Sequence, residues 1–496
     1  MDDSRNEWYK GKMSSLIFLI WIFTFLKNVW ISSAIKKPTP VLLVVFDGFG
    51  SDFLSEANTP NFDKLVENGV TVPFVWNVFP ATSLPNHYTL ATGLYPSSHG
   101  IIGNNVYDSV LNASFTSRTN DSVWFDNAEP IWVTNEKQGF KSGNCYWPGY
   151  NVNISGYYPS LNTINYGYEP PVGPENSSVM PFRDRIDVVI EWLTLPDPPT
   201  FVVVYFEEPD ETSHKFGPHS NQTKQEIIAL DNLMGYLLSR LKQKKIHENL
   251  NLIVTADHGQ IGYNTSFLVN IDQYVNPDLY DFWPMGASSI TPMIIPKKGK
   301  NFTDVVQKFL EAEKKEEGKM KIFKKSDIPD NLHFKYKNRV GDLLIMMEAP
   351  WMFSTSKFSN IMERGTHGYN TSCKSMRPFF IAHGPAFKQG FRGSPIHSVD
   401  IYPLICHLLG IQPAPNNGSI NRCRELLRES TKSGLHLSLT RIIVGGVLAA
   451  AIFVCIGVVI VFKLRKWKAD KNQSSGLMLE TESFMPLMSD LNYDSS

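Results

Sequence analysis

The sequence contains few cysteines, almost no net charge and no evident internal repeat. Five cysteines occur in 496 residues, and Cys455 lies in a long apolar run. The other four are too few for a cysteine-dense module, although an even number suits a secreted domain; they are Cys145, Cys373, Cys406 and Cys423. The formal net charge of −1 provides no bulk basic surface, which argues against binding of a nucleic-acid polymer.

The first of two apolar segments lies near the N-terminus. The run LIFLIWIFTFL over Leu16–Leu26 follows Lys10 and Lys12 and precedes small residues that end at Ala34. This pattern is typical of a secretory signal peptide, so we expect residues 1–34 to be removed by cleavage near Ala34. A signal anchor is the alternative, but the apolar run is too short to favour it.

The second apolar segment, Ile442–Phe462, carries no charged residue and is long enough to cross a bilayer. Basic residues follow it at once, which predicts a cytosolic tail over 463–496. We therefore expect a single-pass type I protein of the plasma membrane, with an extracellular domain over 35–423 and a polar stalk over 424–441. About 400 residues between the apolar ends are enough for one large domain or two small ones.

Acceptor sequences for N-glycosylation agree with secretion. Nine N-x-S/T sequons without proline at the middle position lie between the two apolar segments. They also mark expected surface loops. Their asparagines are Asn112, Asn120, Asn153, Asn176, Asn221, Asn264, Asn301, Asn370 and Asn417.

Continuous apolar runs rich in β-branched residues predict strands that are buried on both faces. Three such runs are Val41–Phe46, Phe201–Phe206 and Leu252–Thr255. Helical patterns alternate with the strands, as expected of an α/β fold with a mainly parallel sheet. Helices are expected at 60–69, 130–139, 183–193, 224–242 and 400–409, and further strands at 71–78, 140–147, 290–295 and 343–347. The Lys/Glu-rich stretch 297–325 is expected to be helix on a surface subdomain.

The segment FPATSLPNHYTLATG, over Phe79–Gly93, is expected to place a hydroxyl at the start of a helix. Pro85 suits a first helical turn, and Gly93 suits the position that ends a helix. Thr82 and Ser83 would then lie where free N–H groups and the positive end of the helix dipole favour a phosphate. The alternative is that either hydroxyl only caps the helix.

Acidic and histidine residues gather where the predicted strands end. In open α/β sheets, ligands bind beyond the carboxyl ends of the strands, so three strands would deliver five such residues to one edge, and a sixth would come from a distant loop. Singly, each has an ordinary explanation as a turn residue or a solvated helix start. Together they suit Zn²⁺ better than Mg²⁺, which prefers oxygen ligands. The residues are Asp47, Asp210, His214, Asp257, His258 and, from the loop, His367.

Several motifs in a fixed order make the sequence recognisable. They are VVFDGF, TSLPNHYTLATGLYPSSHGI, EEPDETSHKFGP, TADHG, GTHGYN and RPFFIAHGPAF. From about Pro40 to Cys423 the chain closely resembles the ecto-nucleotide pyrophosphatase/phosphodiesterase family of the alkaline phosphatase superfamily. The resemblance implies an alkaline-phosphatase-like core, with helices flanking a mainly parallel central sheet and a small inserted subdomain. It makes residues 35–423 a phosphodiesterase catalytic domain, similar to the smaller membrane-anchored members.

The resemblance implies two zinc sites, carried over by motif. One would hold Asp210, His214 and His367, and the other would hold Asp47, Asp257 and His258 together with the nucleophile oxygen. Two metals about 3.5–4 Å apart would clamp the attacking and leaving oxygens of an in-line displacement at phosphorus.

The nucleophile position departs from the family pattern. Ser83 stands where the family usually has threonine, and Thr82 beside it remains an alternative. A serine hydroxyl can also attack phosphorus. Leu84 stands where the family usually has an aromatic residue that packs on the base, which predicts weaker base stacking. Asn104 matches the family asparagine that holds a phosphate oxygen, an oxyanion-hole role.

The family also suggests a base-binding region and a disulfide. Tyrosines follow Trp147, and Tyr157 or Tyr158 is the expected stacking residue. Cys406 and Cys423 resemble a family disulfide that spans a short loop. Cys145 and Cys373 then remain as the candidates for a second pair.

The expected function is hydrolysis of phosphodiester or pyrophosphate bonds in extracellular nucleotides, with two Zn²⁺ and a covalent nucleotidyl-serine intermediate. NAD, dinucleoside polyphosphates and nucleoside di- and triphosphates are the candidate substrates, and nucleoside 5′-monophosphates the products. One alternative is a phospholipid or phosphocholine diesterase, which Leu84 leaves open. Another is a catalytically silent ectodomain used in adhesion or signalling, although such a domain need not keep six metal-type residues.

Overall fold

The computed structural model describes residues 37–163, 180–357, 364–429, 452 and 455–471. The chain divides into two compact units, Met1–Arg428 and Glu429–Ser496. The first unit contains every residue that the sequence nominates for the site. The predicted signal peptide, 1–34, lies outside the described residues.

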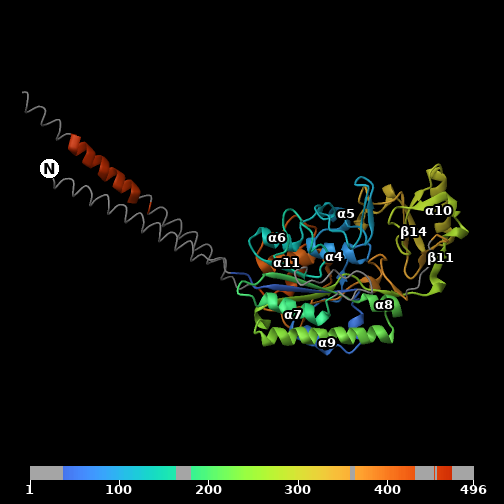
Figure 1. Ribbon diagram of the computed structural model, residues 1–496, viewed down its shortest axis with the longest axis horizontal. Coiled ribbons are helices and arrows are strands. Elements are labelled where there is room, and N and C mark those ends of the chain that lie inside the picture. Colours follow the sequence, from blue (N-terminus) through green and yellow to red (C-terminus); the bar gives the residue numbers. More distant parts are fainter. Residues whose placement is uncertain (1–36, 164–179, 358–363, 430–451, 453–454, 472–496) are drawn as a thin grey trace, which may run out of the picture. The chain divides into compact units, whose positions relative to one another are not determined.

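An eight-stranded sheet forms the centre of the first unit (Figure 1). Five neighbouring strands are parallel, and β18 pairs antiparallel with both of its neighbours. The order is β19 (Phe391–Arg392), β2 (Val70–Thr71), β18 (Phe380–His383), β9 (Asn251–Ala256), β1 (Val41–Asp47), β8 (Phe201–Pro209), β6 (Ser142–Cys145) and β7 (Leu161–Asn162). The expected α/β fold with a mainly parallel sheet is confirmed.

The three predicted apolar strands lie side by side at the middle of this sheet. Every residue of β1 is buried, because helices cover both faces of the sheet. In β1, Val45 pairs with Tyr205 of β8 on one side and with Thr255 of β9 on the other. The register with β8 then shifts, so that Asp47 lies opposite Pro209. The shift falls where the strands end and the polar residues begin.

Helices cover the two faces of the sheet (Figure 1). On one face α7 (Phe182–Leu193) and α9 (Asn221–Gln243) pack on β8, and α3 (Pro60–Asn68) packs on α9. On the other face lie α4 (Ser83–Thr92), α6 (Ile131–Lys137) and α11 (Ile401–Leu409). All six were expected from the sequence, with small differences at their ends.

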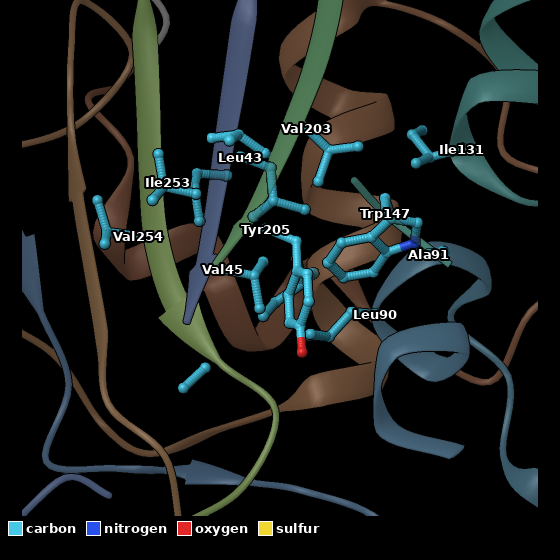
Figure 2. Close-up of a cluster of buried hydrophobic side chains, with 14 of the residues drawn as sticks. Leu43, Val45, Leu90, Ala91, Ile131, Trp147, Val203, Tyr205, Ile253 and Val254 are labelled. Atoms are coloured by element: carbon cyan, nitrogen blue, oxygen red, sulfur yellow. The ribbon is translucent and has the colours of Figure 1, made fainter. Parts of the chain in front are cut away.

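Apolar side chains lock α4 onto the sheet, as Figure 2 shows. Leu90 and Ala91 of α4 face Val45 and Tyr205 of the central strands, and Trp147 packs beside them. These side chains are almost completely buried. The start of α4 is therefore held at a constant position relative to the ends of β1 and β8.

A second, antiparallel sheet forms the inserted subdomain. Its four strands, in the order β12 (Tyr280–Phe282), β13 (Met293–Pro296), β15 (Leu343–Met347) and β14 (Met320–Lys324), pair with one another, and α10 (Phe302–Lys315) packs on β14. Phe309 of α10 and Ile345 of β15 belong to a separate hydrophobic core. The expected small subdomain is confirmed, but its Lys/Glu-rich stretch is a shorter helix followed by a strand. Asn301 caps that helix by accepting from the N–H groups of Thr303 and Asp304.

Short elements complete the first unit, and one expected strand is broken. The predicted strand 71–78 is divided into β2 and β3 (Val75–Trp76). The remaining helices and strands are α2 (Phe53–Glu56), α5 (Pro96–His99), α8 (Asp210–Phe216), α12 (Ile420–Cys423), β4 (Val106–Asp108), β5 (Ala113–Phe115), β10 (Ile261–Gly262), β11 (Leu268–Asn270), β16 (Met352–Ser354), β17 (Gly365–Thr366) and β20 (Ile396–His397).

The five cysteines, all within the described residues, are free thiols, so the expected Cys406–Cys423 disulfide is not formed. Both side chains face the apolar core, where burial raises the pKa of the Cys406 thiol to about 12. A pair of Cys145 and Cys373 is also absent. Cys145 lies within the central sheet, whereas Cys373 packs against the core of the inserted subdomain.

The predicted single-pass type I anchor over 442–462 is contradicted. Among the described residues, no helix is long and apolar enough to cross a membrane. Residues 455–471 form a helix, but charged side chains occupy its second half from Lys463 onward. Residues 430–451, 453–454 and 472–496, which include more than half of the expected anchor and most of the expected stalk and tail, lie outside the described residues. The compact first unit continues past Cys423 to Arg428.

Replacing Gly93 by alanine is expected to destabilise the fold. Gly93 ends α4 with a φ of 66°, and an added Cβ would lie 3.0 Å from Tyr402 Cδ1 and 3.1 Å from Asn416 Cβ. The left-handed backbone alone costs an alanine about 1–2 kcal/mol, and the close contacts add to this cost. Chemical denaturation of the full-length protein measures the change.

Gly139→Ala is the matched control. Gly139 has a φ of 86°, but an added Cβ would meet no atom within 4 Å among the described residues. Gly139→Ala should therefore show the backbone cost alone. Equal losses in the two variants would contradict the packing against Tyr402.

Candidate active site

Six acidic and histidine residues meet at the carboxyl edge of the central sheet. Asp47 ends β1, Asp210 begins α8 directly after β8, and Asp257 follows β9 with His258 beside it. Because β8, β1 and β9 are parallel neighbours, their ends deliver these residues to one place. His367 reaches the same place from the turn after β17.

The first candidate metal group comprises Asp47, Asp257 and His258, all buried. One donor atom of each lies within 4.8 Å of the others. The Nε2 atom of His258 is 3.3 Å from Asp47 Oδ1 and 3.4 Å from Asp257 Oδ2. Asp257 Oδ1 accepts from the backbone N–H of Gly48 at 3.0 Å. The buried Oδ2 atom of Asp257 receives no hydrogen bond from the described residues.

The second candidate metal group comprises Asp210, His214 and His367, again with donor atoms within 4.8 Å of one another. Asp210 Oδ2 lies 3.3 Å from His214 Nε2, and Asp210 Oδ1 lies 3.9 Å from His367 Nε2. The rings of His258 and His367 stack with their centroids 3.9 Å apart, so the two groups adjoin.

The donor set fits divalent metal ions. Each of the three histidines places Nδ1 against a backbone carbonyl oxygen: His214 on Gly365 and His367 on Ala81, both at 2.9 Å, and His258 on Gly259 at 3.1 Å. A carbonyl oxygen only accepts, so Nδ1 carries a proton and Nε2 is the ring nitrogen that faces the carboxylates. This is the usual arrangement of metal-binding histidines. Asp257 Oδ2 accepts no hydrogen bond from the described residues, although His87 Nε2 and His258 Nε2 each lie 3.4 Å from it, so it is a further candidate ligand for a cation.

Burial and neighbouring charges shift the pKa values of these ligands in different directions. Burial opposes ionisation of Asp210, but the charges of His214 and His367 outweigh it and hold the pKa of Asp210 far below its ordinary value. Burial, aided by the charge of His258, lowers the pKa of His367 to about 3. Burial acts against the charge of His258, yet Asp257 and Asp47 raise its pKa to about 10. A cation is therefore favoured between Asp47 and Asp257.

Ser83 lies at the start of α4 and faces the first group. Its Oγ is 3.4 Å from Asp47 Oδ1, to which it donates, and 3.3 Å from His258 Nε2. Thr82 is the N-cap residue, and its buried Oγ1 has no hydrogen-bond partner among the described residues. Of the two hydroxyls that the sequence left open, the geometry favours that of Ser83.

Asn104 lies beside the nucleophile segment. Its side-chain oxygen accepts from the N–H of Leu84 at 2.8 Å. Because the oxygen is engaged, the amide Nδ2 is the group that can donate to a ligand. Asn104, Leu84 and Ser83 all line one cavity of about 280 Å³, so the donor and the hydroxyl face a common space.

Aromatic rings and a few charged groups form the rest of this cavity. Its walls include Tyr88, Phe115, Phe125, Tyr146 and Tyr150, with Arg118, Glu207 and Glu211 also among the lining residues. Tyr157 and Tyr158, the expected stacking residues, are not among the described lining residues and are 38% and 51% exposed. Their role in base stacking stays a prediction, whereas Tyr146 and Tyr150 of the segment YWPGY, directly after β6, do line the cavity. The signal available in the sequence was the position of YWPGY at the end of the predicted strand 140–147.

Two supporting residues were missed from the sequence. Tyr205, near the end of β8, donates its hydroxyl to Asp47 Oδ2 at 2.5 Å. Gln260 donates to Asp210 Oδ1, and its own side-chain oxygen accepts from Ser213 at 2.6 Å. In the sequence, Tyr205 could have been noticed as a polar group within the buried run FVVVYF. Gln260 could have been noticed as the polar residue directly after ADHG. Both residues hold a candidate metal-binding carboxylate.

The α/β sheet, a serine at a helix start and the adjoining metal groups define a metal-dependent hydrolase of phosphate esters. Residues 41–370 match the family described as type I phosphodiesterase / nucleotide pyrophosphatase. The chain belongs to this family and is an enzyme of the phosphodiesterase/pyrophosphatase class.

Similar proteins of this class include two from Homo sapiens. The chain is 37% identical to ectonucleotide pyrophosphatase/phosphodiesterase family member 5 over 396 residues, which cover 79% of this chain and 78% of that protein. It is 36% identical to bis(5′-adenosyl)-triphosphatase ENPP4 over 435 residues, which cover 86% and 89% of the two chains.

A solved structure shows the same fold. It is murine ectonucleotide pyrophosphatase / phosphodiesterase 5, as an inactive threonine-to-alanine variant in complex with AMP. The match has a TM-score of 0.71 and 37% identity, and it covers 79% of this chain and all of that chain. The alkaline-phosphatase-like core expected from the sequence is therefore shown.

Addition of Zn²⁺ to the metal-free protein is expected to raise its stability. A ligand that binds only the folded state at 100 times its Kd adds about 2.7 kcal/mol. Thermal unfolding of the full-length protein, stripped by a chelator and titrated with ZnCl₂, measures the gain. His214→Ala should lose part of it. His247→Ala, which removes an imidazole paired with Glu248 away from both groups, should keep all of it. An equal gain in all three proteins would place the zinc elsewhere.

Proposed function

We propose that this enzyme hydrolyses nucleotide phosphodiesters and pyrophosphates with Ser83 as nucleophile, releasing nucleoside 5′-monophosphates. The observation that carries the proposal is the position of Ser83 Oγ, 3.4 Å from Asp47 Oδ1 and 3.3 Å from His258 Nε2 at the start of α4. There the hydroxyl faces one candidate metal group and adjoins the other. It also opens onto the aromatic cavity, which is suited to a nucleoside.

Two Zn²⁺ ions are the proposed cofactors, one in each three-residue group. A set of imidazole and carboxylate donors suits zinc. Asp210, His214 and His367 would hold one ion, and Asp47, Asp257 and His258 the other. When bound, zinc supplies Lewis acidity and positive charge that favour ionised oxygens near phosphorus.

Ser83, the N-terminus of α4 and Asn104 have separate roles in the proposed reaction. Ser83 Oγ loses its proton to water and attacks the phosphorus that carries the nucleoside, the bond to the leaving oxygen breaks, and a nucleotidyl-serine forms. The N-terminus of α4 favours the negative charge at this position. Asn104 Nδ2 is placed to donate to the phosphate oxygen that gains charge. Water then hydrolyses the ester and returns Ser83 to its free form.

The cavity and the similar proteins support the proposed substrate class. A solved relative is described as bound to AMP, and another relative is named a bis(5′-adenosyl)-triphosphatase. Tyr88, Phe125 and Tyr146 offer aromatic walls for a base. We therefore propose dinucleoside polyphosphates, NAD and nucleoside di- and triphosphates as substrates.

Hydrolysis of a chromogenic nucleotide diester by the full-length protein tests the reaction class. We expect release of a nucleoside 5′-monophosphate that a zinc chelator abolishes and added Zn²⁺ restores, because both metal groups adjoin the nucleophile. Release that persists in the chelator would contradict the zinc assignment. No release from a zinc-loaded protein would contradict the nucleotide assignment, and hydrolysis of a lysophospholipid in the same assay would then identify a lipid diesterase.

Ser83→Ala is expected to lower kcat by about 10⁴- to 10⁶-fold, as loss of a nucleophile does in hydrolases. Zinc content should stay at the wild-type level, because the six carboxylate and imidazole ligands remain. The control is Thr82→Val, which removes the neighbouring hydroxyl, a group without a hydrogen-bond partner among the described residues. Turnover by Ser83→Ala together with loss of turnover by Thr82→Val would assign the nucleophile to Thr82.

A further inference from the structure

Tyr205 joins the apolar core to the acidic edge of the sheet. Its side chain is 9% exposed, and its hydroxyl donates to Asp47 Oδ2 across 2.5 Å. Figure 2 shows the ring between Val45, Leu90 and Trp147, with the hydroxyl oxygen pointing toward the carboxyl ends of the strands. A phenol buried among apolar side chains usually finds a hydrogen-bond partner, and here that partner is a candidate metal-binding carboxylate.

The two oxygens of Asp47 have different surroundings. Oδ1 lies 3.3 Å from His258 Nε2 and 3.4 Å from Ser83 Oγ, so it faces the site. Oδ2 accepts the hydroxyl of Tyr205. The carboxylate therefore presents one oxygen to the site while the other is occupied within the core.

The backbone and two neighbours hold Tyr205 in place. Val45 lies opposite Tyr205 in the parallel register, so Asp47, two residues further along β1, points to the same face. Nη1 of the buried Arg185 donates to the carbonyl oxygen of Tyr205 at 2.7 Å. The ring of His87 packs edge-on against Tyr205, with centroids 4.9 Å apart and planes at 86°. The position of the hydroxyl is thus set by the fold itself.

We infer that Tyr205 is a positioning residue that restricts Asp47 to one oxygen toward the metal ion and Ser83. Without the hydroxyl, the carboxylate is free to turn and to offer both oxygens, which changes the ligand geometry and the place of Ser83 Oγ. Hydrogen-bond partners of metal ligands orient those ligands in this way. The inference rests on the proposed zinc-dependent function and adds to it the residue that sets the binding mode of Asp47.

Tyr205→Phe in the full-length protein tests the inference, because it removes one oxygen and keeps the ring. The first readout is zinc retention, measured by titrating the zinc-loaded protein with a chromogenic chelator. We expect one of two zinc ions to leave at a chelator concentration about 10- to 100-fold lower, the usual effect of losing such a partner. On a nucleotide diester, kcat should fall while KM changes little, because the cavity walls remain.

Tyr236→Phe is the matched control. Tyr236 of α9 also donates its hydroxyl to a carboxylate, at 2.8 Å and 2.9 Å from the two oxygens of Asp187, but outside the cavity. Its loss should leave zinc retention and kcat at wild-type values. Circular dichroism of both variants checks that each is folded.

A double-mutant cycle separates positioning from general packing. In an Asp47→Ala background, Tyr205→Phe should cause no further loss of zinc, because its effect passes through Asp47. A full additional loss in that background would overturn the inference, as would wild-type zinc retention and kcat in Tyr205→Phe. Those two results leave the proposed function intact. A wild-type protein that binds no zinc would instead overturn the proposed function and this inference with it.

Discussion

The close approach of three carboxylates at one edge of the sheet, two of them buried and the third, Asp210, half-buried, is the constraint on which the rest of the site depends. Asp47, Asp210 and Asp257 repel one another, and removing such charges from water costs several kcal/mol each unless partners compensate. The surroundings supply imidazoles, the N–H of Gly48 and the hydroxyl of Tyr205. The compensation is incomplete, since Asp257 Oδ2 receives no hydrogen bond from the described residues. The site therefore attracts cations next to the proposed nucleophile, Ser83.

The position of Ser83 is set by the packing of the second half of α4, away from the candidate metal ligands. Most of α4 is buried, and Leu90 and Ala91 anchor its second half on the central strands (Figure 2). Asn86 fixes the first half of α4 to the preceding segment: its side chain accepts from the N–H of Val78 at 2.8 Å and donates to the carbonyl oxygen of Thr82 at 2.9 Å. The same apolar contacts that stabilise the domain therefore set the distance between the serine oxygen and Asp47. Stability and reactivity depend here on one set of side chains.

Strand ends were the part of the site that the sequence could predict. Continuous apolar runs locate β1, β8 and β9, and the parallel rule then brings Asp47, Asp210 and Asp257 together. His367 needed the family resemblance, because its approach depends on β17 pairing with β10, a two-residue contact without any periodic signal. Tyr157 and Tyr158 do not line the cavity of about 280 Å³, and their role in base stacking stays a prediction, because the irregular chain after β6 has no periodic pattern. The expected Cys406–Cys423 disulfide is also absent, since thiol pairing cannot be read from composition, and the predicted single-pass anchor is contradicted.

The stacked rings of His258 and His367 act as a spacer between the two metal groups. Their centroids are 3.9 Å apart and their planes are inclined by 16°, so the thickness of an aromatic ring sets the gap between the groups. Two rings in van der Waals contact cannot approach further, and each is tethered through Nδ1 to the backbone. The spacing between the two groups is therefore set by two rigid rings, although His367 lies on a turn between segments that are distant in the sequence. Evolution could lengthen or shorten that turn without altering the distance between the two groups.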